Sequence, residues 1–309
     1  MGYLMNAIDF SRVTKIYKKG FFATRIPALV DCSFSVAPSV ITGFVGSNGA
    51  GKTTAIKIIM GLVRPGSGVI KVLGIDPSDP RSRRDIAFIS EQPYFYNHLT
   101  VDETLMFAAR LHGRKSAGLH GDIDAALIKV DLKGHNKRKI RDLSKGMQQR
   151  CAMAQALLLK ASMLVLDEPL SGLDPPGRTL FRSILLSLAE TGVTVFFSTH
   201  ILDDVALVCQ NVVALSRGKT EYEGPISGLL DRGFIGTDIV LSGTAGPILE
   251  DLGRMGCEIT PLGAEKTKVF VAAGKDVLQC QRLLLENRIL CESVSRRMIP
   301  LEEVLYKQK

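Results

Sequence analysis

One glycine-rich segment, Gly46–Thr53, carries the residue types that bind phosphate groups. Its sequence GSNGAGKT matches the pattern G-x-x-x-x-G-K-[ST]. Glycines let successive backbone N–H groups turn toward one anion, and the positive end of a following helix adds to the attraction. Lys52 would bring a charge to the phosphates and Thr53 a hydroxyl to Mg²⁺. The expected phosphate contacts are Gly46, Ser47, Asn48, Gly49, Ala50, Gly51, Lys52, Thr53 and Thr54.

Two adjacent carboxylates, Asp167 and Glu168, follow the apolar run Met163–Leu166. The run predicts a buried strand, and because side chains alternate along a strand, the two carboxylates should point in different directions. One of them could then reach Mg²⁺ while the other orients and activates a water. Acidic residues at a strand end are commonly just solvated, but the phosphate loop upstream favours the catalytic interpretation.

The elements around both motifs alternate between strands and helices. Ile41–Val45 predicts a short strand and Thr53–Leu62 a helix, so the phosphate loop joins them as a nucleotide-binding βα unit requires. Met163–Leu166 and Val193–Ser198 predict further strands, separated by a helix over Thr179–Ala189. This alternation predicts an α/β domain with a mostly parallel sheet and helices on both faces.

Two further parts of the chain depart from this alternation. The pattern from Thr100 to about Arg141 is helical, which predicts a helical subdomain, about residues 95–150, inserted into a first domain over residues 1–232.

After Gly224-Pro225, short strands and helices predict a small α+β domain over residues 233–309. It carries no glycine-rich loop and no His/Cys/Asp cluster, so we expect it to regulate or dock rather than to catalyse. Its last residues, Pro300–Lys309, predict a short amphipathic helix, because proline favours the start of a helix and lysine its end.

Composition excludes several classes of protein. Of 309 residues, 46% are hydrophobic and 23% are charged, an ordinary globular mixture. No apolar run approaches the roughly 18 residues of a membrane-spanning helix, so a membrane role is expected only through a partner. The six cysteines are scattered without a C-x-x-C pair, which argues against a zinc site or a disulfide framework. The net charge is +8, but the basic clusters Arg81–Arg84 and Lys133–Arg141 contain no aromatics to stack on bases, so no nucleic-acid partner is expected.

Further motifs carry a family resemblance. Leu143–Arg150, LSKGMQQR, resembles the signature sequence of ABC ATPases and lies shortly before the acidic strand. Ser171–Pro175 resembles the D-loop of that family, and His200 its switch histidine. Gln92 resembles the Q-loop glutamine, and Tyr17 is placed like the aromatic that stacks on adenine.

The resemblance covers about residues 5–225 and implies a P-loop NTPase core with an N-terminal antiparallel β subdomain. It also implies ATP and Mg²⁺ as cofactors, bound at the interface of a head-to-tail dimer. In that dimer Ser144 and the Gly146 N–H would contact the γ-phosphate held by the other subunit.

Within one subunit, the resemblance gives each remaining residue a role. Glu168 would be the general base, and His200 would contact the γ-phosphate. Gln92 would touch both Mg²⁺ and the attacking water, while Thr53 and Asp167 would complete the metal site.

One departure is visible in the signature itself. The commonest form in the family reads L-S-G-G-Q, whereas Lys145 and Met147 replace its first glycine and its glutamine here. The serine and the second glycine remain, so the phosphate contacts should too, and variants of this kind are familiar among export-type members.

Three ABC machines fit these features. The first is an exporter ATPase with separate membrane permease subunits, acting as a homodimer on the inner face of the cell membrane. The short tail, with Pro300–Leu305, is similar to the C-terminal extension of bacterial exporter ATPases. The second is an importer ATPase, although the tail is short for one. The third is a soluble ABC ATPase acting on ribosomes or nucleic acid, although such proteins usually carry two cassettes or coiled coils.

Overall fold

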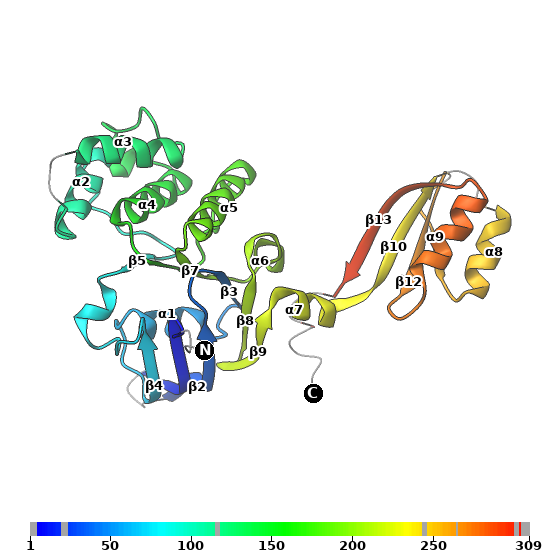
Figure 1. Cartoon of the computed structure of the whole chain (residues 1–309), viewed down its shortest axis with the longest axis horizontal. Helices are drawn as coiled ribbons and strands as arrows, with labels where there is room; N and C mark the ends of the chain where they lie inside the picture. The colour runs from blue at the N-terminus through cyan, green and yellow to red at the C-terminus, as the bar shows by residue number, and fades with distance from the viewer. Residues whose placement is uncertain are drawn as a thin grey trace. The chain divides into compact units, whose positions relative to one another are not determined.

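The computed structural model describes residues 5–19, 24–114, 118–242, 246–263, 265–299 and 303. The chain divides into two compact units, Met1–Ile226 and Ser227–Lys309 (Figure 1). The helix predicted over Pro300–Lys309 lies outside the described residues, apart from Glu303. In the described ranges, no helix has both the length and the apolar character that crossing a membrane requires.

The centre of the first unit is a six-stranded sheet. Its order is β5 (Ile86–Ile89), β6 (Met163–Leu166), β7 (Thr194–Thr199), β3 (Ile41–Val45), β8 (Asn211–Ser216) and β9 (Lys219–Pro225). All neighbours run parallel except β9, which is antiparallel to β8. The residues of β3, β6 and β7 are all buried, as expected for parallel strands covered on both faces.

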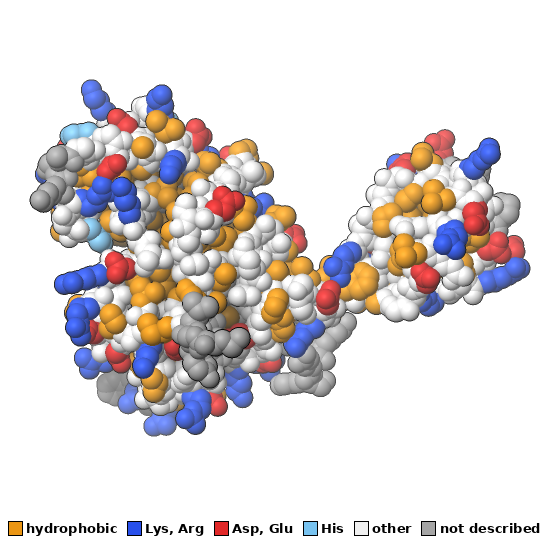
Figure 2. Space-filling model, viewed as in Figure 1, with side chains coloured by type: hydrophobic (Ala, Val, Ile, Leu, Met, Phe, Trp, Pro, Cys, Tyr) orange, Lys and Arg blue, Asp and Glu red, His pale blue; other side chains and the backbone are white. Residues whose placement is uncertain are grey.

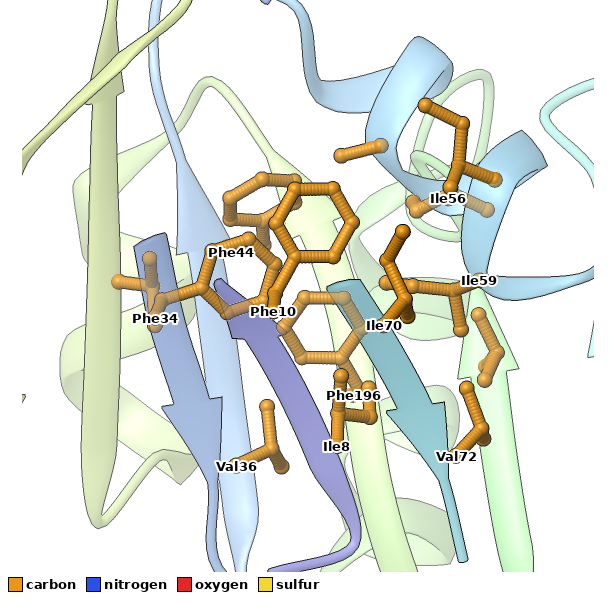
Figure 3. Packing of buried hydrophobic residues seen from close by; sticks show 14 of the residues in the cluster. Ile8, Phe10, Phe34, Val36, Phe44, Ile56, Ile59, Ile70, Val72 and Phe196 are labelled. Carbon is orange, nitrogen blue, oxygen red and sulfur yellow. The ribbon is translucent and has the colours of Figure 1, made fainter. Parts of the chain in front are cut away.

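A second, antiparallel sheet packs against the first. It has the order β2 (Thr24–Val36), β1 (Ile8–Lys19) and β4 (Ser67–Val72). Phe10 and Phe34 stack at 4.7 Å between ring centroids, and Phe34 lies 5.3 Å from Phe44 of β3. Phe196 of β7 completes this group, 5.1 Å from Phe44 (Figure 3). These rings form the core that fixes the two sheets relative to one another.

Helices cover both faces of the six-stranded sheet. Helix α1 (Lys52–Ile59) lies on the face toward the antiparallel sheet, and its buried Ile56 and Ile59 join the same core (Figure 3). Helices α5 (Pro175–Glu190) and α6 (Leu202–Val208) lie on the other face (Figure 1). The predicted P-loop α/β fold class is therefore confirmed.

The helical segment contains α2 (Val101–Leu111), α3 (Leu119–Lys129) and α4 (Lys145–Leu159). Two 3₁₀ turns, η1 (Pro80–Arg83) and η2 (Ile140–Asp142), precede α2 and α4. Helix α2 begins with a capping box, because Thr100 and Glu103 each accept a hydrogen bond from the backbone N–H of the other.

The second unit is a small α+β domain that follows α7 (Ile226–Gly233). Its antiparallel sheet has the order β11 (Glu258–Pro261), β12 (Lys266–Ala272), β10 (Phe234–Ser242) and β13 (Leu290–Met298). Helices α8 (Gly246–Arg254) and α9 (Val277–Glu286) pack on the buried face of that sheet. The sequence analysis did not predict β11 and β13, because both strands are mostly exposed and lack apolar alternation.

On the face drawn in Figure 2, lysine and arginine side chains alternate with aspartate and glutamate.

Candidate functional site

The phosphate loop connects β3 to α1, and two of its glycines are required by close packing. A Cβ atom on Gly46 would lie 2.5 Å from the Leu215 carbonyl oxygen, and one on Gly51 would lie 2.5 Å from the Ala28 carbonyl oxygen. Gly51 also has φ 110°, a left-handed conformation that glycine adopts without strain. The loop is therefore held between β2 and β8, and the N-terminus of α1 faces the cavity beside the loop.

Lys52 is the first residue of α1 and is 6% exposed. Its Nζ donates to the carbonyl oxygen of Gly46 at 2.7 Å and to that of Ser47 at 3.3 Å. The same Nζ lies 3.3 Å from Glu168 Oε1. The lysine ammonium thus lies over the backbone of the loop, beside the carboxylate that was predicted to be catalytic.

The two adjacent carboxylates do contact different partners, but for a different reason than strand alternation. Strand β6 ends at Leu166, before either of them, and Glu168 has φ 48°. Asp167 is buried and accepts a hydrogen bond from the Ser198 hydroxyl at 2.6 Å. The same hydroxyl accepts from the Glu168 backbone N–H at 2.9 Å. One serine at the end of β7 therefore sets the turn that separates the two acids.

His200 lies directly after β7 and faces Glu168. Its Nδ1 is 3.0 Å from Glu168 Oε2, a hydrogen-bond distance in which the ring N–H donates to the carboxylate. Glu168 is thus held between an ammonium and an imidazole, on the wall of an open cavity.

That cavity has a volume of about 460 Å³. It is lined by Ile26, Pro27, Ala28, Asn48, Gly49, Gly51, Lys52, Thr53, Thr54, Glu91, Glu168, Ser171 and His200. The structure therefore brings six of the nine expected phosphate contacts together with Glu168 and His200. Gly46, Ser47 and Ala50 do not line the cavity.

Other predicted site residues lie elsewhere. Gln92 is exposed and does not line the cavity. Its backbone carbonyl accepts a hydrogen bond from the Ser90 hydroxyl. Tyr17 is 38% exposed on β1, where it pairs with the cavity residue Ile26 of the neighbouring strand. It thus lies next to the cavity without lining it.

Ser144 and Gly146 lie at the start of α4 and do not line the cavity. Ser144 is the N-cap of that helix and accepts a hydrogen bond from the Met147 N–H at 3.3 Å. Gly146 faces Leu173, and Gln149 on the same helix donates to the Pro169 carbonyl at 3.2 Å. The start of α4 is therefore joined to the segment that follows Glu168.

Two polar residues of the site, Glu91 and Ser198, were not predicted from the sequence, and Ser171 was named only as the first residue of the D-loop motif. Ser198 is the penultimate residue of the fully buried strand β7, and a hydroxyl at that position could have been noticed as a partner for the neighbouring acids. Glu91 follows β5, which is the strand next to β6, so parallel pairing brings it toward Asp167 and Glu168. Only the cavity in the tertiary structure distinguishes Glu91, which lines it, from its neighbour Gln92, which does not.

The donor set fits a divalent cation beside the phosphates. Thr53, Asp167 and Glu91 offer hydroxyl and carboxylate oxygens, the hard ligands that Mg²⁺ prefers. Lys52 alone cannot balance Glu91, Asp167, Glu168 and a triphosphate, so a cation would reduce the repulsion among them.

Comparison with known proteins agrees with this geometry. A family model described as ABC transporter matches residues 29–171. An uncharacterized ABC transporter ATP-binding protein of Nostoc is 39% identical over 223 residues, which are 71% of this chain and 67% of that protein. The Nod factor export ATP-binding protein I of Rhizobium etli is 32% identical over 238 residues, which are 76% of this chain and 73% of that protein.

A solved structure is also similar in fold. The dimeric, post-hydrolysis structure of the ATP-binding cassette MJ0796, bound to ADP and Pi, superposes with a TM-score of 0.65 and 26% identity. The match covers 71% of this chain and 98% of that one.

Proposed function

Because this chain belongs to the family of ABC transporter ATP-binding proteins, we propose that it hydrolyses ATP to power a membrane exporter. The observation that carries the proposal is the position of Glu168, which contacts both Lys52 and His200 on the wall of the phosphate-loop cavity. The family implies ATP binding and hydrolysis, whereas the residue roles, the partners and the direction of transport are the substance of the proposal.

Phosphate binding is assigned to the loop and the start of α1. Backbone N–H groups from Asn48 to Thr54 would surround the β- and γ-phosphates. Lys52 would exchange its bonds to Gly46 and Ser47 for bonds to the phosphates, which also releases Glu168 from its ion pair. Tyr17, beside the cavity, would stack on the adenine.

Metal binding is assigned to oxygen donors of which Thr53 lines the cavity, whereas Asp167 is buried directly before Glu168 and does not line it. Thr53 and Asp167 would hold Mg²⁺, with Gln92 or the cavity residue Glu91 as a further contact. When bound, Mg²⁺ would neutralise phosphate charge and favour the departure of the terminal phosphate.

Water activation is assigned to Glu168. Its carboxylate would accept a proton from the water that attacks the γ-phosphorus, while the bond from that phosphorus to the bridging oxygen of ADP breaks. His200 would orient Glu168 and contact the γ-phosphate, because its ring N–H already reaches Glu168 Oε2.

The start of α4 supports a dimer. Ser144 and Gly146 lie away from this cavity at a helix N-terminus, a position suited to an anion supplied by another subunit. We propose a homodimer in which these residues contact the γ-phosphate on the partner. ATP would then stabilise the closed dimer, and hydrolysis would release it.

Export is favoured by the relative named for Nod factor export. We propose separate integral membrane permease subunits, to which this chain binds at the inner face of the membrane. Recovery of the tagged chain with a multi-span membrane protein from the neighbouring coding region is expected, and stable recovery with ribosomes or DNA instead would contradict the assignment.

The decisive experiment compares the Mg-ATPase turnover of the purified chain with that of Glu168→Gln. Removing the base should lower turnover about a hundredfold or more while nucleotide still binds. The variant should also accumulate as an ATP-loaded dimer in size-exclusion chromatography, because the closed state forms but does not reset. Equal turnover in the two proteins would sink the assignment of Glu168.

A further inference from the structure

An ion pair between a buried carboxylate and partly exposed arginines joins α5 to α6, the two helices that begin at the edge of the nucleotide site. Asp204 is 1% exposed and accepts a hydrogen bond from Arg182 Nη2. Its other oxygen, Oδ2, lies 3.9 Å from Arg178 Nη1. Arg178 and Arg182 are one turn apart on α5, so both face the same side chain of α6.

Each helix starts immediately after a segment of the site. Asp174 is the N-cap of α5 and accepts a hydrogen bond from the Gly177 N–H at 3.1 Å. Helix α6 starts at Leu202, two residues after His200. Arg178 and Asp204 are each four residues beyond Asp174 and His200, respectively, so the ion pair fixes the first turns of both helices against one another.

The pair is poorly arranged for stability alone. Among the described residues, neither Arg182 Nε nor Asp204 Oδ2 has a hydrogen-bond partner, although both atoms are buried. Burying charge costs free energy that an incompletely bonded pair does not fully recover, and apolar side chains often stabilise such a position equally well. A pair arranged in this way is weak evidence for a purely stabilising role.

We propose that Asp204 is a positioning residue that acts through His200. Its contact with Arg182 holds the first turn of α6, and with it His200, at the 3.0 Å approach to Glu168. The inference rests on the proposed ATPase function, because it states how parts of that site are held. The pair does not touch the phosphate loop, so its loss should lower turnover far more than it weakens nucleotide binding.

The test uses the full chain and the variant Asp204→Asn, which keeps the shape and removes the charge. Its matched control is Asp122→Asn, because Asp122 also lies in the first turn of a helix, α3, and pairs with an arginine, Arg114. Asp204→Asn should lower kcat about tenfold or more, with KM for ATP within about twofold of the wild type. Asp122→Asn should change neither constant.

A second variant separates positioning from stability. Asp204→Leu combined with Arg182→Met replaces the pair by apolar side chains of similar size. The expected result is a melting temperature equal to or above that of Asp204→Asn, with kcat still low. Recovery of kcat together with stability, or wild-type kcat in Asp204→Asn, overturns the inference.

Hydrogen exchange covers the case in which the wild type hydrolyses no ATP, which would contradict the proposed function itself. The Ile201 N–H donates to Thr199 Oγ1 at 3.0 Å and reports on the His200 segment. Its exchange should be faster in Asp204→Asn and in the apolar double variant than in Asp122→Asn. Equal exchange in all three variants contradicts the positioning role.

Discussion

Three contacts and an unusual backbone conformation hold Glu168. Lys52 and His200 contact its carboxylate, and its backbone N–H donates to Ser198. A non-glycine residue at φ 48° costs of order 1 kcal/mol, which the surrounding contacts must offset. Ser198 therefore matters to the site as much as the acids do, because its hydroxyl fixes both Asp167 and the turn after it.

Glu91 and its neighbour Gln92 differ in their position relative to the cavity. Only Glu91 lines the cavity, so Glu91→Gln should raise the Mg²⁺ concentration needed for half-maximal nucleotide binding by roughly tenfold, because a carboxylate is the stronger hard ligand. Titration of Mg²⁺ against a fluorescent ATP analogue measures this directly. Gln92→Ala serves as the comparison, and a shift in that variant but not in Glu91→Gln would restore the metal contact to Gln92.

At the scale of elements, the helices differ in how their N-termini are capped. Ser144, Asp174 and Asp276 each cap a helix through their side chains. The phosphate-loop helix α1 has no side-chain cap, because its N-terminus is left open toward the cavity. Helices α4 and α5, which precede and follow Glu168 in the chain, thus begin with a side-chain cap, whereas α1 and α6 do not.

The capping box of α2 makes a testable case. In Thr100→Ala the Glu103 N–H loses its acceptor, and the free energy of unfolding should fall by about 1 kcal/mol. Urea denaturation of the full chain measures the change. Ser183→Ala removes an exposed hydroxyl from the middle of α5 and should stay within about 0.5 kcal/mol of the wild type. Equal effects of the two substitutions would show that the cap contributes nothing.

At the scale of the whole molecule, each unit has a core of its own. Four phenylalanines and the buried face of α1 fill the core of the first unit. Ile239, Leu241, Val269 and Val271 fill that of the second, under α8 and α9. On the exposed face of the sheet in the second unit, charged side chains make the contacts instead. Asp238 of β10 contacts Arg297 of β13 and Lys268 of β12.

This cluster predicts a pH dependence in the second unit. Burial alone would raise the pKa of Asp238, but hydrogen bonds from Arg297 and Lys268, together with their charges, lower it below its ordinary value. The stabilisation is therefore complete above the ordinary aspartate pKa of about 4 and is lost as the pH falls through the lower folded-state pKa. Asp238→Asn should cost about 1–3 kcal/mol at pH 7 and progressively less as the pH falls below about 4.

Thermal unfolding of the full chain between pH 2 and 7 checks this prediction. Glu292→Gln removes the more exposed pair with Lys266 and should have a smaller effect. A pH-independent cost of Asp238→Asn would contradict the ion-pair explanation.

Much of the molecule could be predicted from local sequence. The strands Ile41–Val45 and Met163–Leu166 have the predicted bounds, since continuous apolar runs have few alternatives to a buried strand. The phosphate loop was also recognisable, because its chemistry depends on backbone N–H groups and one lysine within eight consecutive residues. The α/β class and the family follow from these local signals and their order along the chain.

Only the tertiary structure decided which side chains meet. The ion pair of Asp204 with Arg182 joins residues 22 positions apart, and the contact of Ser198 with Asp167 spans 31. No local pattern encodes such pairs, because their distances depend on how parallel strands align and on how helices pack over them. The choice of Glu91 over Gln92 for the cavity is of the same kind. Glu91 and Gln92 are neighbours in the sequence, and the turn after β5 brings only Glu91 to the cavity.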